Sequence, residues 1–178
     1  SLGLDVAYQA DLFGGVRRSV ESSRATYEAS GFTYANVLIS TEAETARNYV
    51  LARLYQAQLA NARDSLGVQD DNLEIAGYRL KAGLVSSLDT EQARAQRAQT
   101  AATIPTLEQN YNAAVSRLGV LTGQAPGALK ADLAATAPIP TAAGAIPVGI
   151  PADTLRQRPD VRAAERSLAA ATAQIGVA

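Results

Sequence analysis

The feature that most constrains this chain is a long run without proline, residues 11–82. Its interior is interrupted only by isolated glycines, Gly31, Gly67 and Gly77, each of which costs a helix about 1 kcal/mol relative to alanine. Asp11 can cap the start of a helix here. A continuous helix over this run would be roughly 100 Å long, at about 1.5 Å per residue. Because no compact domain of this size is that wide, the run predicts an extended rod.

Apolar and small residues recur along this run at intervals of seven, which indicates a coiled-coil seam. The seam comprises Leu38, Thr45, Ala52, Leu59, Leu66, Leu73 and Leu80, with Ala62 and Ala76 at the partner position. A second set, Leu54, Val68, Ile75 and Ala82, lies two residues further on and so faces nearly the opposite way. One antiparallel partner needs only one apolar face, so the two faces predict neighbours on both sides, as in a flat or closed wall of helices.

A second helix is predicted over residues 88–122, bent at Pro105. Its predicted packing stripe comprises Leu88, Ala95, Ala98, Ala102, Ile104, Leu107, Tyr111, Ala114, Leu118 and Leu121. This helix is about half as long as the first, so something else must cover the remainder of the first helix.

The tip between these two helices lies in "YRLKAGLVSSLDTEQARAQ", residues 78–96. Gly83 is expected to end the first helix with a positive φ, and either Ser86 or Ser87 to cap the second. With Ser86 as the cap, Asp89 occupies the third helical position, where a negative charge is favoured. Leu84 and Val85 have little local core to enter, so they are predicted to remain available for docking.

The regions on either side of the two predicted helices have other sequence patterns. Residues 1–9 alternate apolar and polar side chains, which predicts a strand at the edge of a soluble sheet or in a membrane barrel. Residues 124–151 contain five of the seven prolines and only two charges, so an irregular segment packed against the rods is expected. After it, Pro159 and Asp160 suit the first turn of another helix.

Composition argues against several kinds of function. The net charge of −1 gives no indication of nucleic-acid binding, and the absence of cysteine and histidine removes the commonest metal ligands and general bases. The charged cluster Arg156, Arg158, Asp160 and Arg162 is interpreted as a capped helix start without a ligand. The acids Glu42, Glu44, Asp70, Asp71, Glu74 and Asp89 are interpreted as solvated helix faces. We therefore predict no enzyme activity and no cofactor.

Four motifs occur along the chain in the same order as in a known family: "AYQADLFGGVRR", the tip motif, "LTGQAPGAL" and "LRQRPDVRAAERSLAAATAQIGVA". Together they resemble outer-membrane efflux proteins, in particular the NodT-like branch of the TolC family. The resemblance implies a homotrimer whose β-barrel crosses the outer membrane and continues into a periplasmic α-barrel. It also implies the passive exit duct of a tripartite RND pump, which meets a periplasmic adaptor and, through it, an inner-membrane pump. A lipid-bearing cysteine, common in this branch, would precede the present residues.

The resemblance assigns each segment a place, with this part of the protein in the periplasm. Residues 1–10 correspond to a barrel-strand remnant, residues 11–123 to a long helical hairpin with its tip at about 82–88, residues 124–152 to the equatorial segment, and residues 153–178 to the first helix of the second repeat. The adaptor-docking tip would comprise Ala82, Gly83, Leu84, Val85, Ser86, Ser87 and Asp89.

A structural coiled-coil module, such as a periplasmic adaptor or a scaffold, is the alternative. Adaptor hairpins are usually flanked by glycine-rich, lipoyl-like strands, which this chain lacks, and a soluble scaffold does not need two opposed apolar faces. A second, similar hairpin further along the reading frame would decide for the channel.

Overall fold

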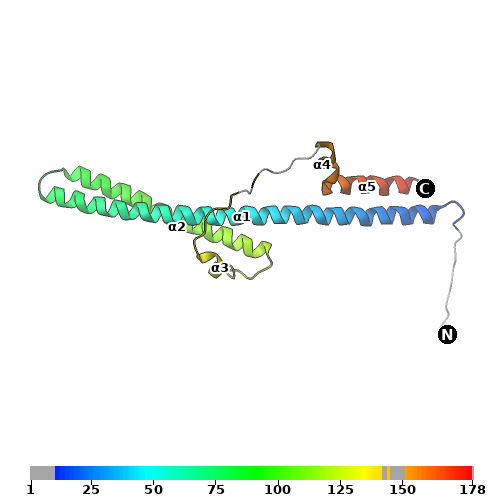
Figure 1. The fold of residues 1–178 in the computed structure, drawn as a ribbon, viewed down its shortest axis with the longest axis horizontal. Helices are drawn as coiled ribbons and strands as arrows, with labels where there is room; N and C mark the ends of the chain where they lie inside the picture. The colour runs from blue at the N-terminus through cyan, green and yellow to red at the C-terminus, as the bar shows by residue number, and fades with distance from the viewer. Residues whose placement is uncertain (1–10, 142–143, 145–150, 178) are drawn as a thin grey trace, which may run out of the picture. The chain divides into compact units, whose positions relative to one another are not determined.

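The computed structural model describes residues 11–141, 144 and 151–177, and the regular structure within these ranges is helical (Figure 1). The helices are α1 (Gly15–Lys81), α2 (Ser87–Leu121), α3 (Lys130–Ala134), α4 (Pro151–Gln157) and α5 (Pro159–Ile175). The predicted mainly α fold with a long antiparallel hairpin is confirmed, whereas the strand predicted at residues 1–9 lies outside the described residues. The chain divides into two units, residues 42–143 and residues 1–41 with 144–178.

The start of α1 is fixed by Asp11, although the helix itself begins four residues later than predicted. The Asp11 carboxylate accepts the backbone N–H groups of Val16 at 3.2 Å and Arg17 at 3.1 Å, two donors that the first turn leaves unpaired. Gly14, at φ +78°, makes the turn that brings the carboxylate back onto the helix end. From there α1 runs for 67 residues, about 100 Å of helix.

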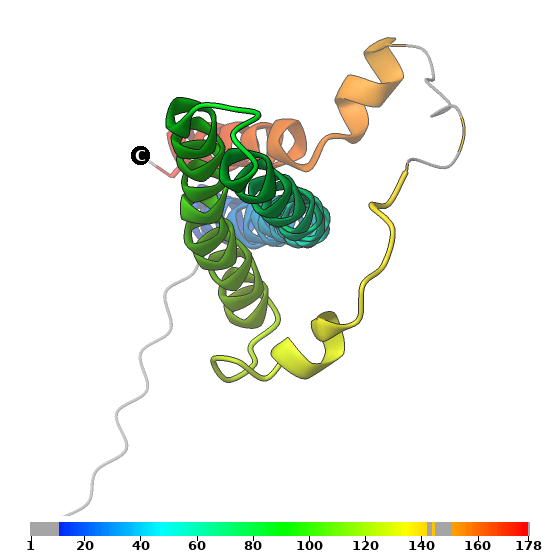
Figure 2. The same cartoon turned by 90° about the vertical axis from the view of Figure 1, so that its left-hand side faces the viewer.

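In the unit of residues 42–143, α2 runs antiparallel to α1, and the two helices are joined at the tip (Figures 1 and 2). The core lies at the opposite end of this hairpin, its base. It contains Ala52, Ala114, Val115, Leu118 and Leu133, bordered by Tyr49, Leu51, Tyr55, Tyr111 and Leu129. Leu133 comes from α3, so part of the proline-rich segment packs against both helices of the hairpin.

Hydrogen bonds hold that segment at the base. The Leu133 carbonyl accepts from Gln56 Nε2 at 2.6 Å and from the Tyr111 hydroxyl at 3.1 Å. Arg53, which is only 6% exposed, donates to the Ala135 carbonyl at 2.7 Å. Burial of a guanidinium is costly unless its donors find acceptors, and here Gln56 Oε1 also accepts from Arg53, at 2.7 Å. Side chains of α1 and α2 thus hold the same short stretch of backbone.

The predicted seam of α1 faces α2 from Thr45 to Leu73, whereas Leu38 and Leu80, at the two ends of the predicted seam, are exposed. Ala52 and Leu59 are buried, and Thr45, Leu66 and Leu73 are half-buried. The second apolar set is different, because Val68 and Ile75 stay exposed within the described chain. An exposed apolar face of this kind is expected on a helix that packs against another helix outside the described chain.

For the first half of α2, the predicted stripe is wrong. Leu88, Ala95, Ala98 and Ala102 are exposed, and the side chains turned inward are instead Thr90, Ala93, Arg97, Thr100 and Ala101. Alanine occurs on every face of this stretch, so its spacing carries no information about which face is covered. From Ile104 onward, where larger apolar side chains occur, the prediction is confirmed.

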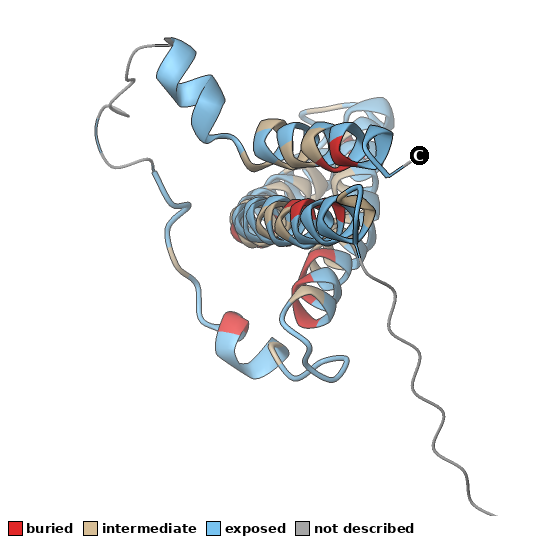
Figure 3. Cartoon of the chain, turned by 90° about the vertical axis from the view of Figure 1, so that its right-hand side faces the viewer, coloured by how far each residue is buried: buried red, intermediate tan, exposed pale blue. Residues whose placement is uncertain are grey.

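In the other unit, α5 lies antiparallel against the first part of α1 (Figure 3). Arg166 pairs with Glu28 at 3.4 Å, and the Arg162 guanidinium stacks 5.4 Å from the centre of the Phe32 ring. Among the described residues of this unit, the buried ones are all small: Ser22, Ala25 and Ala29 on α1, and Ala170 and Ala173 on α5. Side chains of this size allow two helices to approach closely.

The face of α1 turned away from α5 carries a bare row of large apolar side chains. Val20, Tyr27 and Tyr34 are spaced by seven residues and all are exposed, Tyr27 to 80%. Val20 and Ser22 are two residues apart, about 200° around the helix, so this row lies nearly opposite the face that α5 covers. We call Val20, Tyr27 and Tyr34 the bare row.

Candidate functional site

The tip of the hairpin begins with a hydrogen-bonded helix end. Gly83 has φ +72°, as predicted, and its N–H donates to the Leu80 carbonyl at 2.9 Å. The Leu84 N–H donates to the Arg79 carbonyl at 2.9 Å. This pair of bonds satisfies carbonyls that the last turn of α1 would otherwise leave free, and it requires a residue that tolerates the left-handed region.

The start of α2 is equally well defined, and it settles which serine is the cap. Both the N–H and the hydroxyl of Ser86 donate to Asp89 Oδ2 at 2.9 Å, so Ser86 is the cap and Asp89 occupies the third helical position. The Thr90 hydroxyl donates to the Ser87 carbonyl at 2.8 Å. The connection is therefore a short turn fixed by hydrogen bonds at both ends.

This turn presents apolar side chains to solvent. Leu84 is 75% exposed and Val85 is half-buried, while the other predicted tip residues, Ala82, Gly83, Ser86, Ser87 and Asp89, are exposed. Leu88 is 63% exposed and lies next to this turn, at the start of α2, although the sequence spacing predicts it in the packing stripe. We call Leu84, Val85 and Leu88 the tip patch. An exposed apolar patch on a well-defined turn suits the docking of another protein.

Charged groups border the patch on the α1 side. Arg79 and Lys81 lie in the last turn of α1, where positive charge is favoured by the helix dipole. Lys81 Nζ lies 5.8 Å from the centre of the Tyr78 ring. The Tyr78 hydroxyl donates to Glu74 Oε1 at 2.8 Å, and this bond to a carboxylate raises the pKa of Tyr78.

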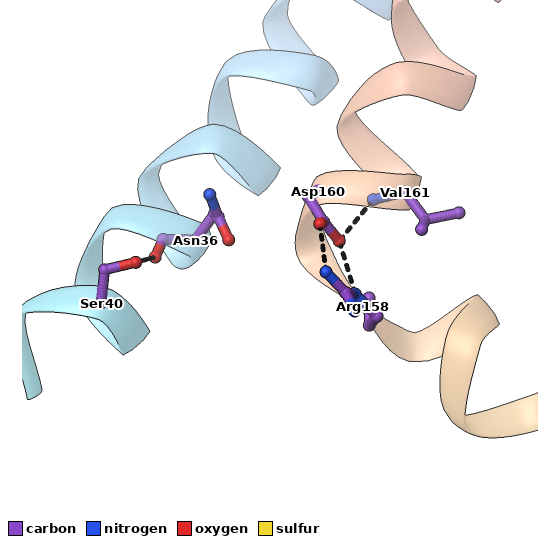
Figure 4. Close-up of polar contacts among 5 residues, drawn as sticks. All are labelled: Asn36, Ser40, Arg158, Asp160 and Val161. Atoms are coloured by element: carbon purple, nitrogen blue, oxygen red, sulfur yellow. Dashed lines mark hydrogen bonds and ion pairs between the residues drawn. The ribbon is translucent and has the colours of Figure 1, made fainter. Parts of the chain in front are cut away.

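Away from the tip, the arginine-rich cluster has a structural role. Arg158 binds Asp160 through two hydrogen bonds, of 3.0 and 2.6 Å, and Asp160 also accepts the Val161 N–H (Figure 4). The hydrogen bonds from Arg158 lower the pKa of the Asp160 carboxyl. Pro159 takes the first turn of α5, as predicted. These contacts complete the start of α5, as the sequence predicts.

Two ion pairs bridge α1 and α2 between the base and the tip. Arg63 pairs with Glu108 at 2.8 Å, nearer the base, and Arg97 pairs with Asp70 at 2.6 Å, nearer the tip. The hydrogen bonds from Arg97 to the ionised Asp70 lower the pKa of this carboxyl from its usual 3.8.

This shift predicts an acid-sensitive contact. Because the pKa of Asp70 is lowered in the folded chain, the pair stabilises the fold above the usual carboxyl pKa and loses that effect as the pH falls through the lowered value. Asp70→Asn should therefore make thermal unfolding less dependent on pH between about pH 5 and pH 2. Asp64→Asn, at an exposed acid of the same helix, is the matched control for the loss of one carboxylate. Equal pH profiles for wild type and Asp70→Asn would contradict the prediction.

Other kinds of site receive no support from the described part of the chain. Residues 11–141 and 151–177 contain no group of three or more acidic side chains placed to hold a metal ion. Among the helices described, none is both long enough and apolar enough to cross a lipid bilayer.

Comparison with known proteins identifies the family. Residues 1–124 match the family described as "Outer membrane efflux protein". The chain is 36% identical over 169 residues to Nodulation protein T of Rhizobium leguminosarum bv. trifolii, covering 93% of this chain and 36% of that protein. It is 34% identical over 179 residues to the toluene efflux pump outer membrane protein TtgF of Pseudomonas putida, covering 98% of this chain and 36% of that protein.

A solved structure agrees with these relatives. The outer-membrane channel OprN superimposes with a TM-score of 0.88 at 38% sequence identity, over 94% of this chain and 37% of OprN. The chain thus spans a little over a third of the length of the proteins it matches. The family match covers more than half of the chain, and the relatives and the fold agree with it. This chain belongs to the outer membrane efflux protein family.

Proposed function

We propose that this chain forms the periplasmic hairpin of a longer outer-membrane channel, the exit duct of a tripartite efflux pump. The duct is a passive conduit for small molecules, with no catalytic residue and no cofactor, and energy comes from an inner-membrane partner. Family membership supports this proposal, as does the similarity to TtgF, a toluene efflux pump outer membrane protein.

The observation that carries the proposal is the pair of opposed faces on α1. In the unit of residues 1–41 and 144–178, α5 covers one face and the bare row occupies the other. In the hairpin unit, α2 covers the seam while Val68 and Ile75 remain exposed on the second face. Exposed apolar rows on a long helix favour burial against further helices. Helices with neighbours on both sides form a wall, and closure of that wall in a homotrimer would leave no bare edge.

The tip patch is where this wall would meet its partner. We assign Ala82, Gly83, Leu84, Val85, Ser86, Ser87, Leu88 and Asp89 to the contact with a periplasmic adaptor, through which the inner-membrane pump is engaged. The hydrogen bonds at both ends of the turn hold the patch in one conformation, which lowers the entropic cost of docking.

A genetic test addresses the proposal directly. Deletion of the gene should make the bacterium more susceptible to toxic small molecules, and the wild-type gene should restore resistance. Leu84→Asp should fail to restore it, because a charge in the tip patch would be desolvated on docking. Leu84→Met is the matched control, since it keeps the site apolar, and it should restore resistance. Unchanged susceptibility after deletion would contradict a role in efflux.

A further inference from the structure

The two ends of the hairpin are held together by different kinds of contact. At the base, large apolar side chains form the core, and Arg53, Gln56 and Tyr111 hold the backbone of residues 133–135. Toward the tip, the inward-facing side chains of α2 include Thr90, Arg97 and Thr100, which bury little apolar surface. Segments with few buried apolar contacts open at lower free-energy cost than a well-packed core.

Gln69 weakens the outer part of the seam further. It lies at the same heptad position as Ala62 and Ala76, in the row that faces α2. Its Oε1 atom is buried, and among the described residues no donor reaches it. A buried acceptor without a donor destabilises the closed state, because the oxygen gave up its hydrogen bonds to water when the helices came together.

Each helix also has a weak point at the level where the outer part begins. In α1 this is Gly67, which lies between Arg63 and Asp70, the residues that pair with α2. Gly67 has no positive φ, and a Cβ added to it would meet nothing within 4 Å. No turn or close approach therefore requires glycine there, and what glycine contributes is backbone freedom within a helix.

In α2 the corresponding point is Pro105, which lies between Arg97 and Glu108, the partners in the same two ion pairs. Proline has no N–H to donate to the carbonyl four residues earlier, so the helix lacks one hydrogen bond there. Kinks in long helices concentrate at such positions. Both weak points thus fall between the base-side and the tip-side ion pair.

We propose that Gly67 and Pro105 form a hinge at which the outer part of the hairpin, residues 68–104, bends and its two helices separate while the base stays closed. Gln69 lowers the stability of the closed arrangement, and the Asp70–Arg97 pair is the contact that must break on opening. The base of the hairpin then stays fixed while the tip moves.

Hydrogen exchange of the full chain, followed by mass spectrometry, tests the hinge. In the wild type, amides of residues 68–104 should exchange faster than those of residues 45–62 and 108–121. Gly67→Ala and Gln69→Leu should each slow exchange of the outer part by about two- to fivefold without affecting the base. Gln58→Leu, at an exposed position of the same helix, is the matched control and should change neither region. Equal wild-type rates in both regions, or variants that slow base and outer part alike, would overturn the hinge.

The consequence for transport rests on the proposed function and has a separate readout. In the full-length channel, the double variant Gly67→Ala, Gln69→Leu should still be cross-linked to its adaptor through the tip but should export more slowly. If export is unchanged while hydrogen exchange behaves as expected, the hinge exists but has no role in transport. Loss of export in Leu84→Asp is independent of both results.

Discussion

In the proposed channel, replacement of Gly83 by valine is expected to abolish docking of the adaptor, while the hairpin stays folded and the proposed trimer still assembles. Gly83 has φ +72°, and a Cβ added there would meet nothing within 4 Å, so the effect arises from the backbone and not from a clash. An L-residue in this region costs about 1–2 kcal/mol, and a β-branched one more. We expect the turn to rearrange, which breaks the Gly83–Leu80 and Leu84–Arg79 hydrogen bonds and displaces the tip patch.

The experiment compares this variant with Gly83→Asn in the full-length channel. Asparagine tolerates positive φ far better than valine does, so Gly83→Asn should keep the turn and most of the docking. Site-specific cross-linking between the tip and the adaptor, together with drug resistance, gives the readout. If Gly83→Val retains both, the tip conformation is not what the adaptor recognises. If both variants fail equally, the added side chain rather than the backbone is responsible.

The second large effect is expected at the base, where Leu118→Ala should destabilise the hairpin. Leu118 is 4% exposed and belongs to the core with Ala114, Val115 and Leu133. Removal of a fully buried leucine side chain costs about 2–5 kcal/mol, because apolar burial is lost and a cavity remains. A loss of this size is a large fraction of the stability of an ordinary domain.

Chemical denaturation of the full chain measures this loss as a lower midpoint with an unchanged slope. Leu88→Ala is the matched control, since Leu88 is exposed at the other end of the same helix, and it should change stability by no more than about 0.5 kcal/mol. Comparable losses in the two variants would mean that the hairpin is not stabilised mainly at its base.

The parts of the fold that could be predicted are those in which side-chain size and spacing carry information. Leucines at intervals of seven identified the face of α1 that contacts α2, and Gly83 and Ser86 identified the turn because few other residues suit those positions. The first half of α2 was misassigned because alanine occupies all of its faces. The spacing predicts Leu88 in the packing stripe, although it is exposed beside the tip.

The contacts that escaped prediction depend on residues far apart in the sequence. Arg53 binds a carbonyl 82 residues away, and no local pattern distinguishes it from an ordinary surface arginine. Gln69 is different, because it lies seven residues from both Ala62 and Ala76. The spacing alone therefore predicts that it belongs to the seam. Its unsatisfied oxygen, however, depends on the neighbouring side chains of α2 and appears only in three dimensions.

If the chain forms part of a closed duct, as proposed, the small residues between α1 and α5 have a consequence for the width of that duct. Ser22, Ala25, Ala29, Ala170 and Ala173 set how closely the axes of these two helices approach. In a closed ring, any increase in one such spacing adds directly to the circumference. In the proposed channel, a leucine in place of Ala25 or Ala173 would therefore alter the bore as well as the local packing.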